Sequence, residues 1–247
     1  ASMAPLAPRR SAAPADRWFF TSTALLMLAL VFIGFAPSYY LSGVLDPPPG
    51  LKPPTPLVHV HGVLVSAWML LFVLQTQLVA WRRTDLHRAL GTIGFVMLPA
   101  MIVIATVSAL YGVHRASGPP MIPPLTFLAV PLLDVPVFAL LIGGALASHR
   151  TPQMHKRLMF IAMIGMMSPA IGRMPLPPPF VGPVAIFALP DLFLLALVLF
   201  DLMTLGRVHR ATVWGGLLLV GSQVLRVLIW ETEGWLAFAR WASGLIA

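Results

Sequence analysis

Long apolar runs alternate with short polar segments along the whole chain, and this alternation predicts helices that cross a membrane. The apolar runs cover residues 18–41, 57–81, 86–111, 125–147, 154–173, 184–205 and 211–230. Each run is close to the roughly 20 residues that a helix needs to cross about 30 Å of hydrocarbon. The first run is longer than the apolar part of a typical signal peptide, so it too is expected to be a spanning helix. The pattern predicts an all-α, polytopic integral membrane protein with a seven-helix bundle.

Composition supports the same class. Apolar residues make up 58% of the chain and charged residues 10%, which excludes an ordinary soluble domain. Cysteine is absent, so disulfides, thiolate metal ligands and cysteine nucleophiles are excluded as well. The formal net charge is +8, but the cations lie between the apolar runs, where their usual effect is to set orientation. The expected partner is therefore the lipid bilayer and not nucleic acid.

A short basic turn occurs three times, at residues 81–91, 149–159 and 206–214. In each copy an apolar run ends, cations follow, and a histidine beside Arg or Lys opens the next run. These histidines are His87, His155 and His209. The repetition predicts one leader helix followed by three helical hairpins.

The other connections, residues 45–56, 112–124 and 175–183, are rich in proline and lie on the opposite side of the predicted membrane. Most cations fall on the side of the basic turns, while Lys52, Arg115 and Arg240 fall on the other side. Because Lys and Arg near span ends favour the cytoplasm, the basic turns are expected inside a bacterial inner membrane. A seven-span chain then has its N-terminus inside and its C-terminus outside.

The two ends of the chain differ from the middle. Residues 1–17 are rich in Ala and Pro and are expected to form a disordered cytoplasmic tail. Residues 18–230 form the predicted seven-span domain. Residues 231–247 form an interfacial tail, in which Trp235, Phe238 and Trp241 are expected on a short amphipathic helix.

Four charged residues fall within the outer parts of the predicted spans, where an unpaired charge is costly. Asp134 and Asp191 are expected about 12 to 14 Å from the outer span ends at about 1.5 Å per residue. Each shares a hairpin with one arginine, Arg173 or Arg226, and each carboxylate is expected to pair with one of these guanidinium groups. The pairs could simply hold neighbouring helices together.

The same residues could instead line an outward-facing pocket for a small polar or anionic ligand. Prolines favour this interpretation, because Pro131 and Pro136 bracket Asp134 and Pro190 precedes Asp191. Proline leaves a helical carbonyl without its donor, and broken helix at membrane depth usually lines protein or a wet cavity. The pocket residues are expected to be His59, His61, Asp134, Arg173, Asp191 and Arg226.

The histidines of the basic turns suggest a second kind of site. Neutral imidazoles from different helices of a bundle can hold haem iron, and an adjacent cation suits the haem propionates. The candidate ligands of haem b are His87, His155 and His209 on the inner side, with His61 and His114 on the outer side. The alternative is that each inner histidine is an interfacial anchor whose ring reaches water. A metal bound by His59 and His61 together is disfavoured, because residues two apart on a helix diverge by about 200°.

Two other classes are excluded by particular residues. A retinal protein needs a lysine within its helices, whereas the two lysines are Lys52 in a loop and Lys156 at the inner rim. A membrane metallohydrolase or desaturase would show closely spaced histidine motifs, and these do not occur.

A resemblance to a known family rests on His61-Gly, Trp68, Gln77, the sequence Leu86-His-Arg-x-Leu-Gly91, Asp134, His155-Lys-Arg-Leu-Met159, Arg173, Asp191, Asp201 and the segment from Trp214 to Arg226. At these positions the chain resembles a family of uncharacterised bacterial seven-span proteins. The resemblance covers nearly everything from residue 57 to the C-terminus. It implies no activity, only that these polar positions belong to one system of sites. Histidines beside arginines near helix ends are also loosely similar to cytochrome b561-type bundles.

Three functions follow as hypotheses. The first is a b-type haem or quinone-linked redox protein. The second is a transporter, receptor or binding protein for a small polar or anionic ligand. The third is an accessory subunit of a membrane complex, in which the charged pairs only join helices. Of the two candidate sites, the outer polar residues are the more expected place for a ligand. Charged side chains deep in the membrane need partners more than imidazoles at the interface do.

The orientation can be tested by labelling. Single cysteines at Thr84, Gln153 and Val208 are expected to resist an impermeant thiol reagent added outside intact cells, whereas a cysteine at Leu51 should react. The reason is the excess of Lys and Arg on the side of the basic turns. Labelling in the reverse pattern would overturn this orientation.

Overall fold

The computed structural model describes residues 14–46, 52–119, 121–182 and 184–246, and these residues are almost entirely helical. The α-helices are α1 (Pro14–Phe35), α2 (Pro56–Ala80), α3 (Thr84–Arg115), α4 (Pro124–Phe127), α5 (Ala129–Ala147), α6 (Pro152–Gly165), α7 (Ser168–Ile171), α8 (Leu189–Leu205), α9 (Arg210–Ile229) and α10 (Glu233–Gly244), with π-helical turns η1 (Ala36–Tyr40) and η2 (Val184–Ala188). The predicted all-α class is confirmed for the described residues. Most of the predicted tail lies outside them, and α1 begins at Pro14, before the expected start at Trp18.

Within the described residues, six helical segments are long and apolar enough to cross a membrane. They cover Ala15–Tyr40, Pro56–Ala80, Thr84–Arg115, Pro124–Ala147, Ala185–Leu205 and Arg210–Ile229. They correspond to six of the seven predicted spans and indicate a membrane-embedded protein.

The fifth predicted span, residues 154–173, is not one long helix. Helix α6 contains 14 residues, and a turn separates it from the four-residue α7. The break has a local cause: Pro169 has no N–H and cannot donate to the carbonyl of Gly165, four residues before it. The count of seven long helices is therefore not confirmed by the described residues.

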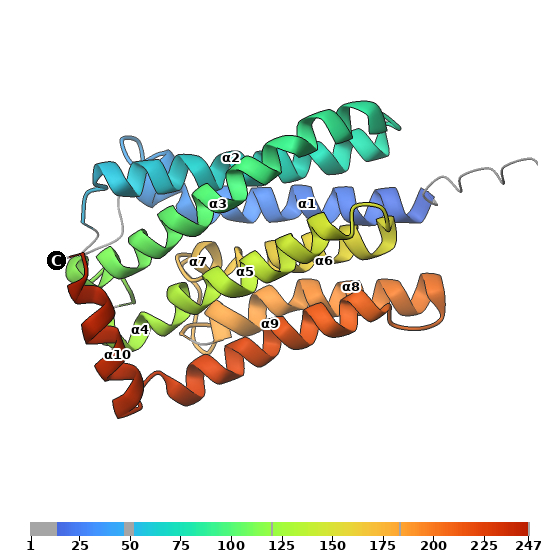
Figure 1. Cartoon of the computed structure of the whole chain (residues 1–247). Helices are drawn as coiled ribbons and strands as arrows, with labels where there is room; N and C mark the ends of the chain where they lie inside the picture. The colour runs from blue at the N-terminus through green and yellow to red at the C-terminus, as the bar shows by residue number, and fades with distance from the viewer. Residues whose placement is uncertain (1–13, 47–51, 120, 183, 247) are drawn as a thin grey trace, which may run out of the picture.

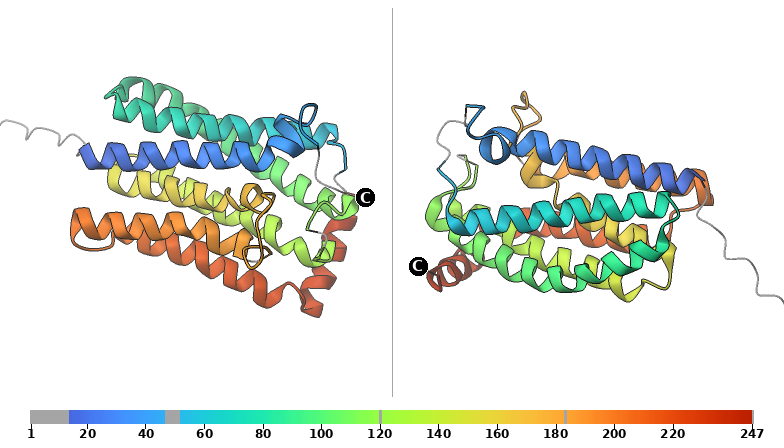
Figure 2. Two further views of the ribbon diagram at one scale, coloured as in Figure 1. Left: turned by 180° about the vertical axis from the view of Figure 1, so that it is seen from behind. Right: turned by 90° about the horizontal axis from the view of Figure 1, so that it is seen from above.

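The arrangement of the helices groups the connections as the sequence predicts. In Figure 1 the turns α2–α3, α5–α6 and α8–α9 all lie at the end of the bundle where α1 begins. Helix α10 lies across the opposite end, and both views in Figure 2 show the long helices running roughly side by side. We call these the inner end, with the basic turns, and the outer end, with α10.

Helix α10 closes the outer end with two polar contacts. The indole N–H of Trp235 donates to the carbonyl of Leu125 at 3.0 Å, and Nε2 of His114 bonds to the carbonyl of Ser243 at 2.9 Å. Trp235 is only 7% exposed, while Trp241 is 62% exposed. The expected terminal helix is present, but its first tryptophan packs on the bundle and does not face outward.

Helix α6 forms the centre of the bundle. It packs against α5, α8 and α9, and Phe160, Ile161, Met163 and Ile164 are completely buried. At its inner end Phe160 lies in an aromatic cluster with Phe19, Phe20 and Phe200. A short, fully surrounded helix of this kind is well placed to carry polar groups that must be kept from lipid.

The strongest polar contact of the core is a completely buried ion pair between Arg157 of α6 and Asp201 of α8. Arg157 Nε donates to Asp201 Oδ1 at 2.9 Å, and another guanidinium nitrogen donates to the backbone and side chain of Gln153. The second carboxylate oxygen accepts from the Thr212 hydroxyl at 2.6 Å and the His209 N–H at 3.0 Å. Three helices and the α8–α9 turn are thus joined at one point.

This network generates a stability prediction. Replacing Asp201 by Asn should lower the free energy of unfolding by about 3 to 5 kcal/mol, because Arg157 would keep its charge in a site without water. Thermal unfolding in detergent would measure the loss. Asp85→Asn is the control, since Asp85 forms an exposed pair with Arg83 at 3.4 Å and exposed pairs contribute about 1 kcal/mol or less. Equal losses in the two variants would contradict a dry, buried pair.

Candidate functional site

Two of the three inner histidines lie next to each other at the inner end of the bundle. The ring centres of His87 on α3 and His155 on α6 are 6.2 Å apart, and the ring planes are nearly perpendicular, at 89°. Nδ1 of His155 is 2.8 Å from the carbonyl of Ala145, and Nδ1 of His87 is 3.4 Å from the carbonyl of Gln75. A carbonyl can only accept, so each Nδ1 carries the proton and each Nε2 is left with a free lone pair.

The two Nε2 atoms are candidate ligand atoms for a metal ion. Imidazole nitrogens bind metals at about 2 Å, and the ring centres lie 6.2 Å apart. An imidazole whose other N–H is held by a carbonyl is the usual arrangement in metal sites. Among the described residues, no group of three or more His, Cys, Asp or Glu side chains could hold a metal. Haem would need only two protein ligands, and His87 and His155 are the two residues that would hold it.

The third inner histidine, His209, is engaged differently. It is the N-cap of α9, and its Nδ1 accepts the N–H of Ala211 at 3.1 Å. Burial lowers the pKa of His209, and the charge of Arg157 lowers it further, so the neutral ring that can accept this bond is favoured. The three inner histidines are therefore not equivalent: His87 and His155 form a pair, and His209 caps helix α9.

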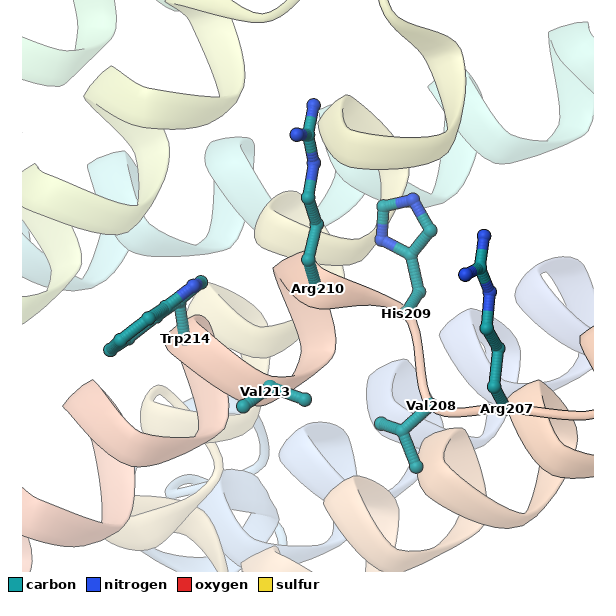
Figure 3. Close-up of a pocket in the computed structure, with 6 residues that line it drawn as sticks. All are labelled: Arg207, Val208, His209, Arg210, Val213 and Trp214. Atoms are coloured by element: carbon teal, nitrogen blue, oxygen red, sulfur yellow. The ribbon is translucent and has the colours of Figure 1, made fainter.

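The α8–α9 turn carries a cationic surface around His209. A cavity of about 560 Å³ is lined by Arg207, Val208, His209, Arg210, Val213 and Trp214. Figure 3 shows Arg207, His209 and Arg210 extending the same way from the turn, with Val208 pointing away from them. Exposed cations beside an exposed tryptophan are typical of the membrane interface, where anionic head groups gather.

At the outer end, the histidine candidates have separate neighbours. His114 holds α10 through its contact with Ser243. Nδ1 of His59 lies 3.4 Å from the hydroxyl of Tyr39. Nδ1 of His61 is buried without a partner, and its charged neighbour is Arg173. His61 is thus the outer histidine whose bonding capacity is unused.

Both outer aspartates contact side chains of α9. Arg226 of α9 is 1% exposed and contacts Asp134 of α5 at 2.6 Å, while a second nitrogen donates to Ser222 at 3.1 Å. Asp191 of α8 accepts from the amide of Gln223, also on α9, at 3.1 Å. Since Gln223 and Arg226 are three residues apart, one side of α9 supplies both partners.

The predicted pairing with an arginine is confirmed for Asp134, whose partner Arg226 belongs to the other hairpin. Asp191 instead accepts from an amide group. Arg173 contacts neither carboxylate; it donates to the carbonyl of Pro169 at 2.7 Å and lies over the ring of Phe35. Arg173 lies at the start of the irregular 172–182 segment, after the helix break.

A line of polar side chains on α2 joins the two ends of the bundle. His61, Trp68 and Gln75 are spaced seven residues apart, so they share one side of the helix. Their atoms His61 Nδ1, Trp68 Nε1 and both amide atoms of Gln75 are buried without a hydrogen-bond partner. The seven-residue spacing is visible in the sequence, but an isolated glutamine between apolar residues gives no sign of its orientation. We call these three residues the α2 polar line.

Comparison with protein-family models, curated proteins and solved structures finds no match. The arrangement of the side chains alone therefore supports the functional proposals that follow.

The outer network generates a second stability prediction. Asp134→Asn should cost about 2 to 4 kcal/mol, because it leaves the buried Arg226 without its counterion. Asp191→Asn should cost about 1 kcal/mol or less, since an amide oxygen can still accept from Gln223. Thermal unfolding of both variants in the same detergent, beside Asp85→Asn, provides the comparison. A loss for Asp134→Asn as small as that for Asp85→Asn would mean that water reaches the ion pair.

Proposed function

We propose that the chain is an integral membrane redox protein that binds haem b between His87 and His155. The observation that carries the proposal is the pair of neighbouring imidazoles, whose ring centres are 6.2 Å apart and whose Nδ1 atoms each lie beside a backbone carbonyl. Bound haem would supply reversible one-electron transfer. A quinone is the proposed electron partner, because it dissolves in the same bilayer.

The protein's own contribution would be to hold the iron ligands and neutralise the haem propionates. The carbonyls of Gln75 and Ala145 keep Nδ1 protonated in both rings and so present Nε2 as the ligand atom. Arg88, next to His87, is exposed and could pair with a propionate. Arg157 anchors α6 two residues after His155 and fixes the height of that ring.

We also propose the seven-span topology in a bacterial inner membrane, with the N-terminus inside and the C-terminus outside. In this arrangement α6, the following turn and α7 together make the fifth crossing. The position of α6 between α5, α8 and α9 supports it, because a helix enclosed by spanning helices lies at membrane depth. Helix α6 alone, with 14 residues, reaches about 21 Å, so the irregular segment after it must cover the rest.

A second candidate function is binding or transport of a small polar or anionic ligand at the outer end. Asp191 favours it, because its half-buried carboxylate accepts from a neutral amide group. The pocket would include His59, His61, Asp134, Arg173, Asp191 and Arg226. An accessory role in a membrane complex, in which these contacts only join helices, is the remaining alternative.

The haem proposal is tested by the absorption spectrum of protein purified from a haem-replete host. We expect a Soret band and about one haem per chain by pyridine haemochrome assay, because one pair of imidazoles would hold one haem. His87→Ala and His155→Ala should each lose most of the bound haem. His149→Ala is the matched control, since the His149 ring is exposed and bonds only to the carbonyl of Leu146. Colourless wild-type protein would overturn the proposal.

A further inference from the structure

The cavity at the α8–α9 turn combines two arginines with apolar side chains. Its volume of about 560 Å³ lies within the range of about 300 to 1,000 Å³ that is usual for sites of small ligands. Arg207 and Arg210 line it, and both are exposed. Figure 3 shows their side chains extending the same way from the turn. The cavity therefore presents two guanidinium groups to whatever enters it.

The carboxylates of the inner end are already paired with other cations. Among the described residues, the ion pairs at this end are Asp16 with Lys156, Asp85 with Arg83 and Asp201 with Arg157. Within the same part of the chain, Arg207 and Arg210 form no ion pair with a carboxylate. Two cations on one turn attract an anion, and the protein's own carboxylates at this end do not supply it.

The start of α9 adds to the positive potential of the cavity. Arg210 is the first residue of this 20-residue helix, and its first turn has no acidic residue. The N-terminal end of a helix dipole is positive, so an anion is favourable there and a cation is not. An anion in the cavity would offset both this arrangement and the repulsion between the two arginines.

Apolar side chains lead from the cavity along one side of α9. Val213 in the cavity wall is followed by Leu217, Val220 and Val224, at spacings of four, three and four residues, so the four share one side of the helix. They are between 37% and 59% exposed. We call them the α9 apolar stripe. The stripe rises about 16 Å at about 1.5 Å per residue, which is close to half of the roughly 30 Å of hydrocarbon in a bilayer.

We propose that this cavity binds the head group of an anionic glycerophospholipid, with the phosphate on Arg207 and Arg210 and an acyl chain along the α9 apolar stripe. Guanidinium groups suit a phosphate because they donate parallel N–H bonds to its oxygens. Trp214 is 71% exposed beside the cavity, and tryptophan favours the level of the head groups. A free phosphate ion would use the arginines but not the stripe. The proposal does not rest on the haem site.

The bound lipid would also stabilise the buried network behind the turn. His209 lies between the two arginines in the sequence, and its N–H donates to Asp201 Oδ2 at 3.0 Å. The hydroxyl of Thr212 donates to the same oxygen at 2.6 Å. The turn that presents the arginines is thus fixed to the core. A ligand that binds only the folded protein raises its unfolding temperature, so lipid binding should be measurable as stability.

The first test measures affinity. Delipidated protein in detergent is titrated with phosphatidylglycerol or with phosphatidylcholine of the same acyl chains, and bound lipid is counted by native mass spectrometry. Phosphatidylglycerol should bind at least about tenfold more tightly, because each arginine near an anionic head group adds to the attraction. Equal affinity for the two lipids would overturn the proposal.

The second test locates the lipid. The double variant Arg207→Gln with Arg210→Gln should bind phosphatidylglycerol at least about tenfold more weakly, and each single variant about threefold more weakly. The matched control is Arg82→Gln with Arg83→Gln, which removes two exposed arginines beside an exposed tryptophan in another turn of the inner end. Its affinity should change by less than about twofold, because exposed charges away from the phosphate are screened by salt. Equal losses in the two double variants would show diffuse attraction to the basic end and contradict a defined site.

The third test distinguishes a lipid from a free anion. Nanodiscs that contain phosphatidylglycerol should raise the unfolding temperature of the wild type and of the Arg82 and Arg83 variant above the values in phosphatidylcholine, but not that of the Arg207 and Arg210 variant. The values in phosphatidylcholine verify that both variants fold. Inorganic phosphate added to wild type in phosphatidylcholine nanodiscs should have no such effect. An equal rise with inorganic phosphate, or no rise with phosphatidylglycerol, would refute lipid binding at this cavity.

Discussion

The buried pair of Arg157 and Asp201 is the constraint on which the inner half of the bundle depends. Two charges enclosed by apolar helices are tolerated only when every oxygen and nitrogen has a partner, and here the partners come from α6, α8, α9 and the turn between the last two. The order of the hairpins follows from this requirement. Helix α6 must lie beside α8 for the pair to form, and α9 must begin beside both for Thr212 to reach the carboxylate.

The buried polar groups have different kinds of partner at the two ends of the bundle. At the inner end the carboxylate of Asp201 is saturated, and the free capacity belongs to the lone pairs of His87 and His155. At the outer end α9 supplies an arginine to one aspartate and only an amide to the other. Asp191 is therefore held by an amide although Arg173 lies at the same end, which is why ligand binding there is the alternative to the inner redox site.

The sequence predicted the helices well because a membrane span is a property of a single segment. Apolar length alone located six of them, and the recurrent basic turns placed three connections at one end. The prediction of one long helix for the fifth span was wrong, because the helix is interrupted between Gly165 and Pro169 although the composition there is still apolar. The particular partners were harder to predict, since the pairing of Asp134 with Arg226 depends on how α5 and α9 rotate against each other. Gln75 and Gln223 were missed for the same reason, whereas the seven-residue spacing of His61, Trp68 and Gln75 could have been noticed.

The short helix α6 has a mechanical consequence. His155 and Arg157 are two residues apart on it, so their side chains point to opposite sides of one rigid rod, one toward α3 and the other toward α8. Any sliding or rotation of α6 that moved the imidazole would also pull the guanidinium group out of its network. The distance between the His87 and His155 rings therefore depends on the Arg157–Asp201 salt bridge on the far side of the helix.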